Sequence, residues 1–153
     1  MKALETRIPP PVIALAFATL IWWMASYLPK IDIEFMPKMA IVSLLVAIGA
    51  IFDLSGLITF LRAKTTVNPM KPHTSSALVK TGIYKITRNP MYVGLAFVLS
   101  GWCIYLNSPA ALIGVAGFIL YIHALQILPE ERMLITLFGE EYMEYQSRVR
   151  RWL

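Results

Sequence analysis

Apolar residues gather into four long runs along the chain, separated by short polar stretches. The runs cover residues 11–28, 39–61, 91–106 and 110–128. A helix needs roughly 20 predominantly apolar residues to cross a bilayer, with about 17 at the lower end. The third run is slightly shorter, so we expect its flanking residues to extend it. The pattern predicts an all-α integral membrane bundle of about four transmembrane helices.

The first run has an alternative interpretation as a secretory signal peptide. Its apolar stretch is long for that role, and the following "MASYLPK" is a poor small-residue cleavage site. We therefore interpret it as the first span of a single membrane domain over residues 1–153. A chain of this length leaves no room for a separate soluble catalytic domain.

The composition supports a membrane location. Hydrophobic residues make up 58% of the chain and charged residues 15%, whereas soluble domains average about 45–50% and about 25%. Cys103 is the single cysteine, so it cannot form an intrachain disulfide, and no Cys/His cluster suggests a metal site. We interpret Cys103 as a packing residue.

The distribution of basic residues predicts the orientation of the bundle. Residues 62–90 carry six basic residues and no acidic one, whereas the loop 29–38 balances two lysines with two acids. If the loop 62–90 and the tail 129–153 are cytoplasmic, every Lys and Arg except Lys30 and Lys38 lies inside. The positive-inside rule favours this arrangement. Both termini are then cytoplasmic, at the inner membrane if the chain is bacterial.

Asp53 is an ionisable residue inside the second run. It lies eight residues before Leu61, or roughly 12 Å along a helix. An ionisable group at such depth is a functional candidate by default. The alternative is a bundle-facing aspartate that bonds to Ser55 or to a neighbouring helix, and the sequence leaves both interpretations open.

His123, Gln126 and Glu130 follow one another near the cytoplasmic end of the fourth run. Their spacing is i, i+3, i+7, so one helix face can carry all three. Pro129 bends the helix without necessarily rotating that face away. The alternative interpretation is a polar cap at the level of the lipid headgroups.

The acidic pair Glu130 and Glu131 directly follows Pro129. Proline followed by acids predicts the start of a helix, because acids are stabilised near the positive end of the helix dipole. That effect alone would explain both glutamates. Adjacent helix positions point about 100° apart, so we expect Glu130 to line a site and Glu131 to hold the tail through Arg148 or Arg151.

The tail beyond Gly139 has the pattern of an amphipathic helix. Tyr142, Tyr145, Val149 and Trp152 recur at i, i+3, i+7 and i+10. Such a helix lies on the membrane or folds back on the bundle. We also expect Glu144 and Arg148 to pair at i, i+4.

Arg88, Asn89 and Pro90 stand directly before the third run. Proline suits the first turn of a helix, so we expect the third helix to begin here. A helix N-terminus offers free backbone N–H groups, and Arg88 adds a bidentate cation. The trio therefore predicts an anion site at the membrane edge. The alternative is a snorkelling arginine that binds lipid phosphate.

Together these residues predict a cytoplasmic rim with an anion site, an acidic pair and several aromatic rings. A ligand with a carboxylate, an ammonium group, hydroxyls and an aromatic ring would fit. S-adenosylmethionine is one such ligand, although composition and spacing alone do not select it from others.

Four segments resemble a known family: "TTVNPMKP", "ALVKTGIYKITRNPMYVGL", "LPEERML" and "FGEEYMEYQSRVRRWL". In this order they are similar to the bacterial branch of the isoprenylcysteine carboxyl methyltransferases, which is related to the membrane phospholipid methyltransferases. The resemblance covers roughly residues 62–153. It implies a small helical membrane enzyme that uses S-adenosylmethionine in a cytoplasmic pocket roofed by the C-terminal segment, with a lipophilic substrate arriving from the bilayer.

The resemblance and the rim together give the candidate site residues. The candidate catalytic residues are Arg88, Glu130 and Asp53. The candidate cofactor-binding residues are Arg88, Asn89, Tyr92, His123, Gln126, Glu130, Glu131, Tyr142, Tyr145, Arg148 and Arg151. The eukaryotic carboxyl methyltransferases usually have histidine where this chain has Asn89, which weakens the transfer of their prenylcysteine substrate, and an isoprenylcysteine-like acceptor stays one of the options.

The methyl acceptor stays open among carboxylate, thiol and amine groups on a lipid or a small molecule. A carboxylate or thiolate needs no base, whereas an amine must first lose a proton, for example to Glu130, Asp53 or His123. A non-catalytic lipid-binding or scaffold protein is the main alternative function. A small transporter would need polar residues along several spans, and here only Asp53 lies deep.

Overall fold

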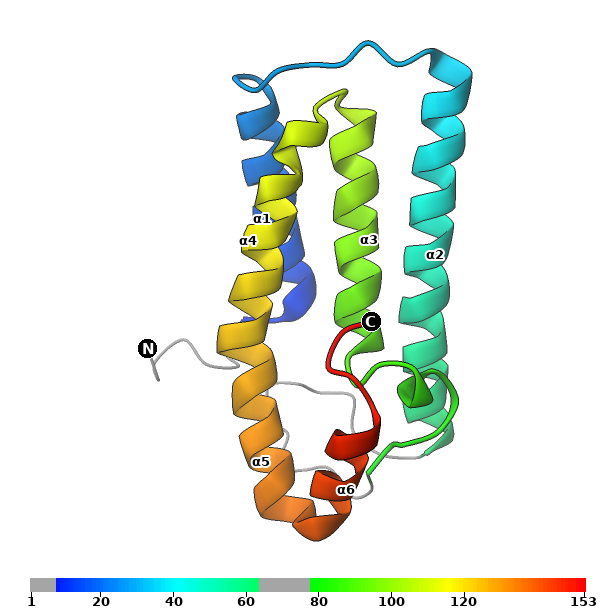
Figure 1. Cartoon of the computed structure of the whole chain (residues 1–153), viewed down its shortest axis with the longest axis vertical. Coiled ribbons are helices and arrows are strands. Elements are labelled where there is room, and N and C mark those ends of the chain that lie inside the picture. Colours follow the sequence, from blue (N-terminus) through cyan, green and yellow to red (C-terminus); the bar gives the residue numbers. More distant parts are fainter. Residues whose placement is uncertain (1–7, 64–77) are drawn as a thin grey trace.

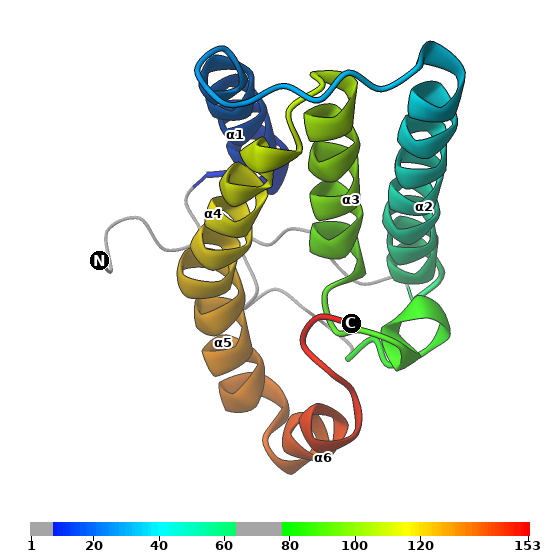
Figure 2. The ribbon, with the colours of Figure 1, turned by 45° about the horizontal axis from the view of Figure 1, so that its top comes forward.

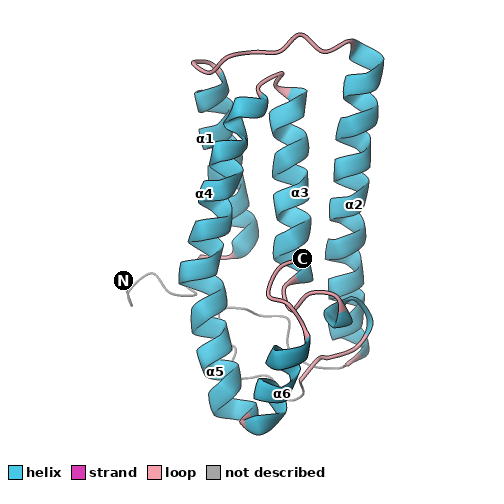
Figure 3. Ribbon diagram, viewed as in Figure 1, coloured by secondary structure: helices cyan, strands magenta, loops and turns pink. Residues whose placement is uncertain are grey.

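The computed structural model describes residues 8–63 and 78–153, and the regular elements of this part of the chain are helices joined by loops (Figure 3). Four apolar helices form the body: α1 (Pro10–Ala25), α2 (Phe35–Arg62), α3 (Pro90–Tyr105) and α4 (Leu112–Ile122). They correspond to the four predicted runs. The segment 64–77, with the motif "TTVNPMKP", lies outside the described residues.

The four helices are not equivalent in their packing. α1, α3 and α4 contact one another, whereas α2 packs on α3 and on the short 3₁₀ turn η2 (Gly82–Lys85). The α1–α2 connection and the α3–α4 turn lie at one end of the bundle, and η2, the last helices and the C-terminus lie at the other (Figures 1 and 2). The candidate site residues therefore gather at one end.

The fourth helix continues past its apolar run without a break. After the 3₁₀ turn η3 (Pro109–Ala111), α4 leads through the π-helical turn η4 (His123–Ile127) into α5 (Leu128–Phe138). α5 begins at Leu128 with Pro129, Glu130 and Glu131 in its first turn, as predicted, but it continues the fourth helix through η4 and does not follow a break in the chain. Proline lacks an N–H and clashes with the preceding turn of an α-helix, and the wider π turn ahead of it accommodates both defects.

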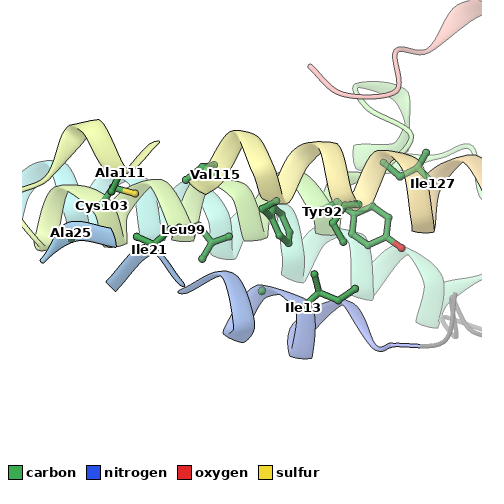
Figure 4. Close-up of a cluster of buried hydrophobic side chains, with 12 residues drawn as sticks. Ile13, Ile21, Ala25, Tyr92, Leu99, Cys103, Ala111, Val115 and Ile127 are labelled. Carbon is green, nitrogen blue, oxygen red and sulfur yellow. The ribbon is translucent and has the colours of Figure 1, made fainter. Parts of the chain in front are cut away.

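The apolar core lies between α1, α3 and α4 (Figure 4). Its largest fully buried apolar side chains include Phe118, Ile21 and Ile122, and Cys103 is also fully buried there. Trp102 ties α3 to α1 by donating its indole N–H to the Ala18 carbonyl over 3.1 Å. Cys103 is thus a packing residue, as predicted.

Large apolar side chains also cover the outside of the bundle. Only 11% of the most apolar stretch of α2 is buried, and Leu44, Ile51 and Leu54 are each more than half exposed. The α2 helix and the continuous helix Pro109–Phe138 are long and apolar enough to cross a membrane, and α1 and α3 are shorter apolar helices. Because soluble monomers rarely expose such large apolar patches, this surface supports membrane association.

Glycines let α2 and α3 approach closely. A Cβ on Gly94 would lie 2.7 Å from the Gly49 carbonyl oxygen, and a Cβ on Gly49 would lie 2.8 Å from the Gly94 carbonyl oxygen. The Asp53 carboxylate also fills the place that a Gly94 side chain would take. Small residues at such contacts allow backbones to pack tightly in lipid, where van der Waals contact drives helix association.

The tail turns back at Gly139, which has a φ of +51°. α6 (Glu140–Arg148) follows and buries Tyr142 and Tyr145, which fits the predicted return to the bundle. The helix ends earlier than predicted, because Val149 is extended. Beyond it, Arg150 forms a parallel bridge with Thr87. The Arg88 N–H, just before α3, donates to the Arg150 carbonyl, and this bond takes the place of one in a further helical turn.

We expect Gly94→Ala to destabilise the bundle, because the added methyl group would overlap the Gly49 carbonyl and the Asp53 carboxylate. Overpacking of this kind costs about 1–3 kcal/mol, so the melting temperature in detergent should fall. Gly101→Ala is the matched control on the same helix, since its Cβ would meet nothing closer than 3.5 Å. Equal melting temperatures for the two variants would contradict the proposed close contact.

Candidate functional site

Glu131 is a buried carboxylate that joins three parts of the chain. Arg151 from the tail donates to it twice, from Nε over 3.0 Å and from Nη2 over 2.7 Å. Arg88, ahead of α3, approaches the same carboxylate with Nη2 at 3.2 Å. Gln146 of α6 adds a bond of 3.4 Å. The side chains of Glu131 and Arg88 are both 8% exposed, so this is an interior charge cluster and not a surface ion pair.

The Arg88 guanidinium has donors to spare. Its Nε and Nη1 atoms are buried and make no hydrogen bond within the described residues. Buried donors without a partner are rare and costly, so their presence marks a place suited to an acceptor ligand. A carboxylate that binds two guanidinium N–H groups at once must use Nη2, which Glu131 also contacts. Glu131 and such a ligand would therefore share Arg88.

The residues before α3 hold the tail through its backbone. Thr87 Oγ1 and Asn89 Nδ2 both donate to the Arg151 carbonyl, over 3.1 and 2.9 Å. The Arg88 N–H donates to the Arg150 carbonyl over 2.9 Å. These bonds explain why the extended tail ends beside the start of α3 in Figures 1 and 2. The Asn89 amide is thus engaged by the tail.

Glu130 has surroundings unlike those of Glu131. Its Oε1 accepts a hydrogen bond of 2.7 Å from the Tyr92 hydroxyl. Tyr92 is buried on α3, and no cation pairs with Glu130 among the described residues. The structure therefore separates the neighbouring glutamates: one is neutralised by two arginines, and the other faces a single phenol.

Three tyrosines complete this end of the bundle. Tyr145 donates its hydroxyl to the Tyr84 carbonyl over 2.7 Å and so fixes the η2 turn. Burial raises the pKa of Tyr142 to about 12, with Glu131 acting in the same direction and Arg88 and Arg151 against it. Burial also raises the pKa of Tyr84 and Tyr145. All three phenols therefore stay protonated at neutral pH.

The structure brings some of the predicted site residues together and leaves others apart. Eight of them meet around the start of α3 and the tail: Arg88, Asn89, Tyr92, Glu130, Glu131, Tyr142, Tyr145 and Arg151. Arg148 instead pairs with Glu144 on the exposed face of α6. That pair was predicted, but it directs Arg148 away from Glu131. Of the two tail arginines that were expected to pair with Glu131, Arg151 is the one that does.

Asp53, His123 and Gln126 occupy other places. Asp53 lies at the α2–α3 contact over Gly94, and its Oδ1 has no hydrogen-bond partner among the described residues. Gln126 donates to the Ile8 carbonyl over 2.9 Å, which ties the start of α1 to η4. His123 begins the π turn. The π turn changes the helical register, so Gln126 and Glu130 bond to different elements.

Sequence reasoning missed the contributions of Thr87 and Tyr84. Thr87 is fully buried and anchors both the tail and the Asn89 N–H. Tyr84 accepts the Tyr145 hydroxyl of α6 at its backbone carbonyl, and its ring packs edge-on against Phe60. A threonine two residues before the helix N-cap was the available signal, because its hydroxyl can bond to nearby backbone groups.

We expect Glu131→Gln to destabilise the protein strongly, because it would leave Arg88 and Arg151 without their shared anion. Removing one partner from a buried ion pair costs about 3–5 kcal/mol, so the melting temperature in detergent should fall. Glu144→Gln is the matched control, because it breaks an exposed Arg–Glu pair that contributes at most about 1 kcal/mol. Similar melting temperatures for the two variants would refute the structural role of Glu131.

Three relatives show what the sequence is similar to. An uncharacterised Haemophilus influenzae protein is 44% identical over 63 residues, which are 41% of this chain and all of that protein. Protein-S-isoprenylcysteine O-methyltransferase B of Arabidopsis thaliana is 30% identical over 105 residues, 69% of this chain and 53% of that protein. Methanethiol S-methyltransferase 1 of Bradyrhizobium diazoefficiens is 39% identical over 67 residues, 44% of this chain and 22% of that protein.

The chain thus spans about half or less of the length of these named relatives. The sequence profile of the phospholipid methyltransferases matches residues 37–141, which begin inside α2, include η2, α3, α4 and α5, and reach the start of α6. The chain therefore belongs to the phospholipid methyltransferase family.

Proposed function

We propose that this protein is an integral membrane methyltransferase that transfers a methyl group from S-adenosylmethionine to a lipophilic or small acceptor. The observation that carries the proposal is the buried Arg88 guanidinium with two unpartnered donors, placed at one end of a bundle with an apolar exterior. Family membership supports the reaction class. The named relatives act on isoprenylcysteine and methanethiol, which supports lipophilic or small acceptors.

The residues around the start of α3 fit S-adenosylmethionine chemically. The free N–H groups of Arg88 suit its carboxylate, and the Glu130 carboxylate suits its ammonium group or ribose hydroxyls. The rings of Tyr142 and Tyr145 suit a sulfonium, which aromatic faces stabilise by about 0.5–2 kcal/mol. When bound, the cofactor supplies a methyl group already activated by its sulfonium. We assign Arg88, Tyr92, Glu130, Tyr142 and Tyr145 to this site.

The remaining candidates have supporting parts in the proposal. Glu131, Asn89 and Arg151 hold the tail in place over the site. Gln126 and His123 form the π turn that sets the direction of α5. Arg148 has no direct contact with this cluster, because it pairs with Glu144.

The protein's task in such a reaction is mainly positioning. Methyl transfer is an in-line displacement, so alignment of the acceptor, methyl carbon and sulfur supplies much of the rate. A carboxylate or thiolate acceptor needs no further help. An amine must first be neutral, and Glu130 is the carboxylate placed to accept its proton, because Glu131 is held by two arginines. Asp53 lies at the helix contact instead.

Purified protein in detergent should bind S-adenosylmethionine and transfer its labelled methyl group to a component of extracted lipids, proteins or small thiols. Arg88→Lys keeps the charge but loses the planar fork. We expect it to weaken cofactor binding by about 1.5–3 kcal/mol, the contribution of a hydrogen bond to a charged group. Isothermal titration measures the affinity.

Arg148→Lys is the control for this experiment, because Arg148 is an exposed arginine of the same tail. Its affinity should equal that of the wild type. Wild-type affinity in Arg88→Ala would remove Arg88 from the site. If the wild-type protein bound no S-adenosylmethionine at all, the proposal would fail, and a non-catalytic lipid-binding or scaffold protein would become the better interpretation.

We further propose four membrane spans with both termini and the site in the cytoplasm, where S-adenosylmethionine is made. A reporter that is active only in the cytoplasm, fused after Leu153, should be active. The same reporter inserted in the α1–α2 connection, at residues 29–34, should be silent because this loop lies at the opposite end of the bundle (Figure 1). The reverse pattern would place the site outside and contradict the proposed orientation.

A further inference from the structure

Three separate segments bring basic side chains to the end of the bundle where α3 begins. Arg62 ends α2, Lys85 ends η2, and Arg150 lies in the extended tail. η2 packs on the last turn of α2 through the rings of Tyr84 and Phe60, whose centroids are 5.3 Å apart. The tail is joined to the residues after η2 by the bridge between Thr87 and Arg150.

These cations differ from the others at the same end. Lys80 pairs with Glu141, Arg148 with Glu144, and Arg88 and Arg151 with Glu131. Within residues 8–63 and 78–153, Arg62, Lys85 and Arg150 form no ion pair. All three are exposed. Their charges are therefore available to an external anion.

Exposed apolar side chains stand beside these free cations. Leu61 is 63% exposed and precedes Arg62, and Ile86 is 57% exposed and follows Lys85. Apolar groups next to cations at the ends of membrane helices match the boundary between acyl chains and lipid phosphates. A soluble acidic partner would neutralise the cations but would leave the exposed Leu61 and Ile86 side chains in water.

We infer that Leu61, Arg62, Lys85, Ile86 and Arg150 form a docking surface for the phosphates of anionic phospholipid headgroups. The inference rests on the proposed insertion of the bundle in a membrane, and it is independent of the methyl-transfer chemistry. The surface would hold anionic lipids beside η2 and the tail, and the tail also bonds to the Arg88 backbone. It therefore adds a lipid preference to this end of the molecule.

The test uses the full chain reconstituted in bilayers that contain spin-labelled phosphatidylglycerol or phosphatidylcholine. Electron paramagnetic resonance measures the fraction of each lipid that is motionally restricted by the protein. We expect the wild type to restrict more phosphatidylglycerol than phosphatidylcholine, with a preference that weakens as salt is added. In Lys85→Gln/Arg150→Gln the ratio should fall towards one, because each basic residue at the surface contributes to anionic-lipid attraction and only Arg62 remains.

Two further variants separate charge at this surface from charge in general. Lys30→Gln/Lys38→Gln removes the same charge from the opposite end of the bundle and should keep the preference. Lys85→Arg/Arg150→Lys keeps both charges and should also keep it. An equal loss in the Lys30/Lys38 variant, or an unchanged ratio in Lys85→Gln/Arg150→Gln, would overturn the inference.

The same spectra distinguish failure of this inference from failure of the membrane proposal. Equal restriction of both lipids by the wild-type protein would overturn the docking surface and leave the membrane bundle standing. If neither lipid were restricted, the chain would not be inserted, and the proposed spans and the docking surface would both be wrong.

Discussion

One buried carboxylate fixes the arrangement of the candidate site. A charge in the interior is tolerated only when it is paired and hydrogen-bonded, and Glu131 meets this requirement with Arg88, Arg151 and Gln146. These partners come from before α3, from the tail and from α6. Satisfying Glu131 therefore requires that α6 and the tail fold back onto the start of α3, and this return encloses Arg88.

The backbone makes this arrangement possible in two places. The π turn His123–Ile127 carries the fourth helix past Pro129 without a break, so α5 extends beyond the apolar bundle before the chain reverses at Gly139. Close contact between Gly49 and Gly94 fixes α2 against α3, and α2 in turn supports η2 through Phe60 and Tyr84. Small departures from regular packing thus position a site built mostly from charged side chains.

Local patterns predicted the helices well, because apolar runs and Pro90 at a helix start act within one segment. Glu131 was expected to pair with Arg148 or Arg151, and the structure selects Arg151. Contacts between segments far apart in the sequence were harder to predict from local patterns. Nothing in the spacing of Val149 and Trp152 indicated that the tail would leave the helix to bond with Thr87 and Asn89. The π turn was not predicted either, because a proline inside a helix can be accommodated in several ways and the local pattern does not select one.

The two neighbouring glutamates show how one helix can separate stability from binding. They point about 100° apart, so Glu131 reaches Arg88 and Arg151 while Glu130 reaches Tyr92. Because Arg88 and Arg151 both pair with Glu131, Glu130 forms no ion pair within the described residues. Arg88 is held by one atom and keeps Nε and Nη1 unbonded. The scaffold thus leaves the Glu130 carboxyl group and part of the Arg88 guanidinium outside the ion pairs, and a zwitterionic ligand needs one partner of each kind.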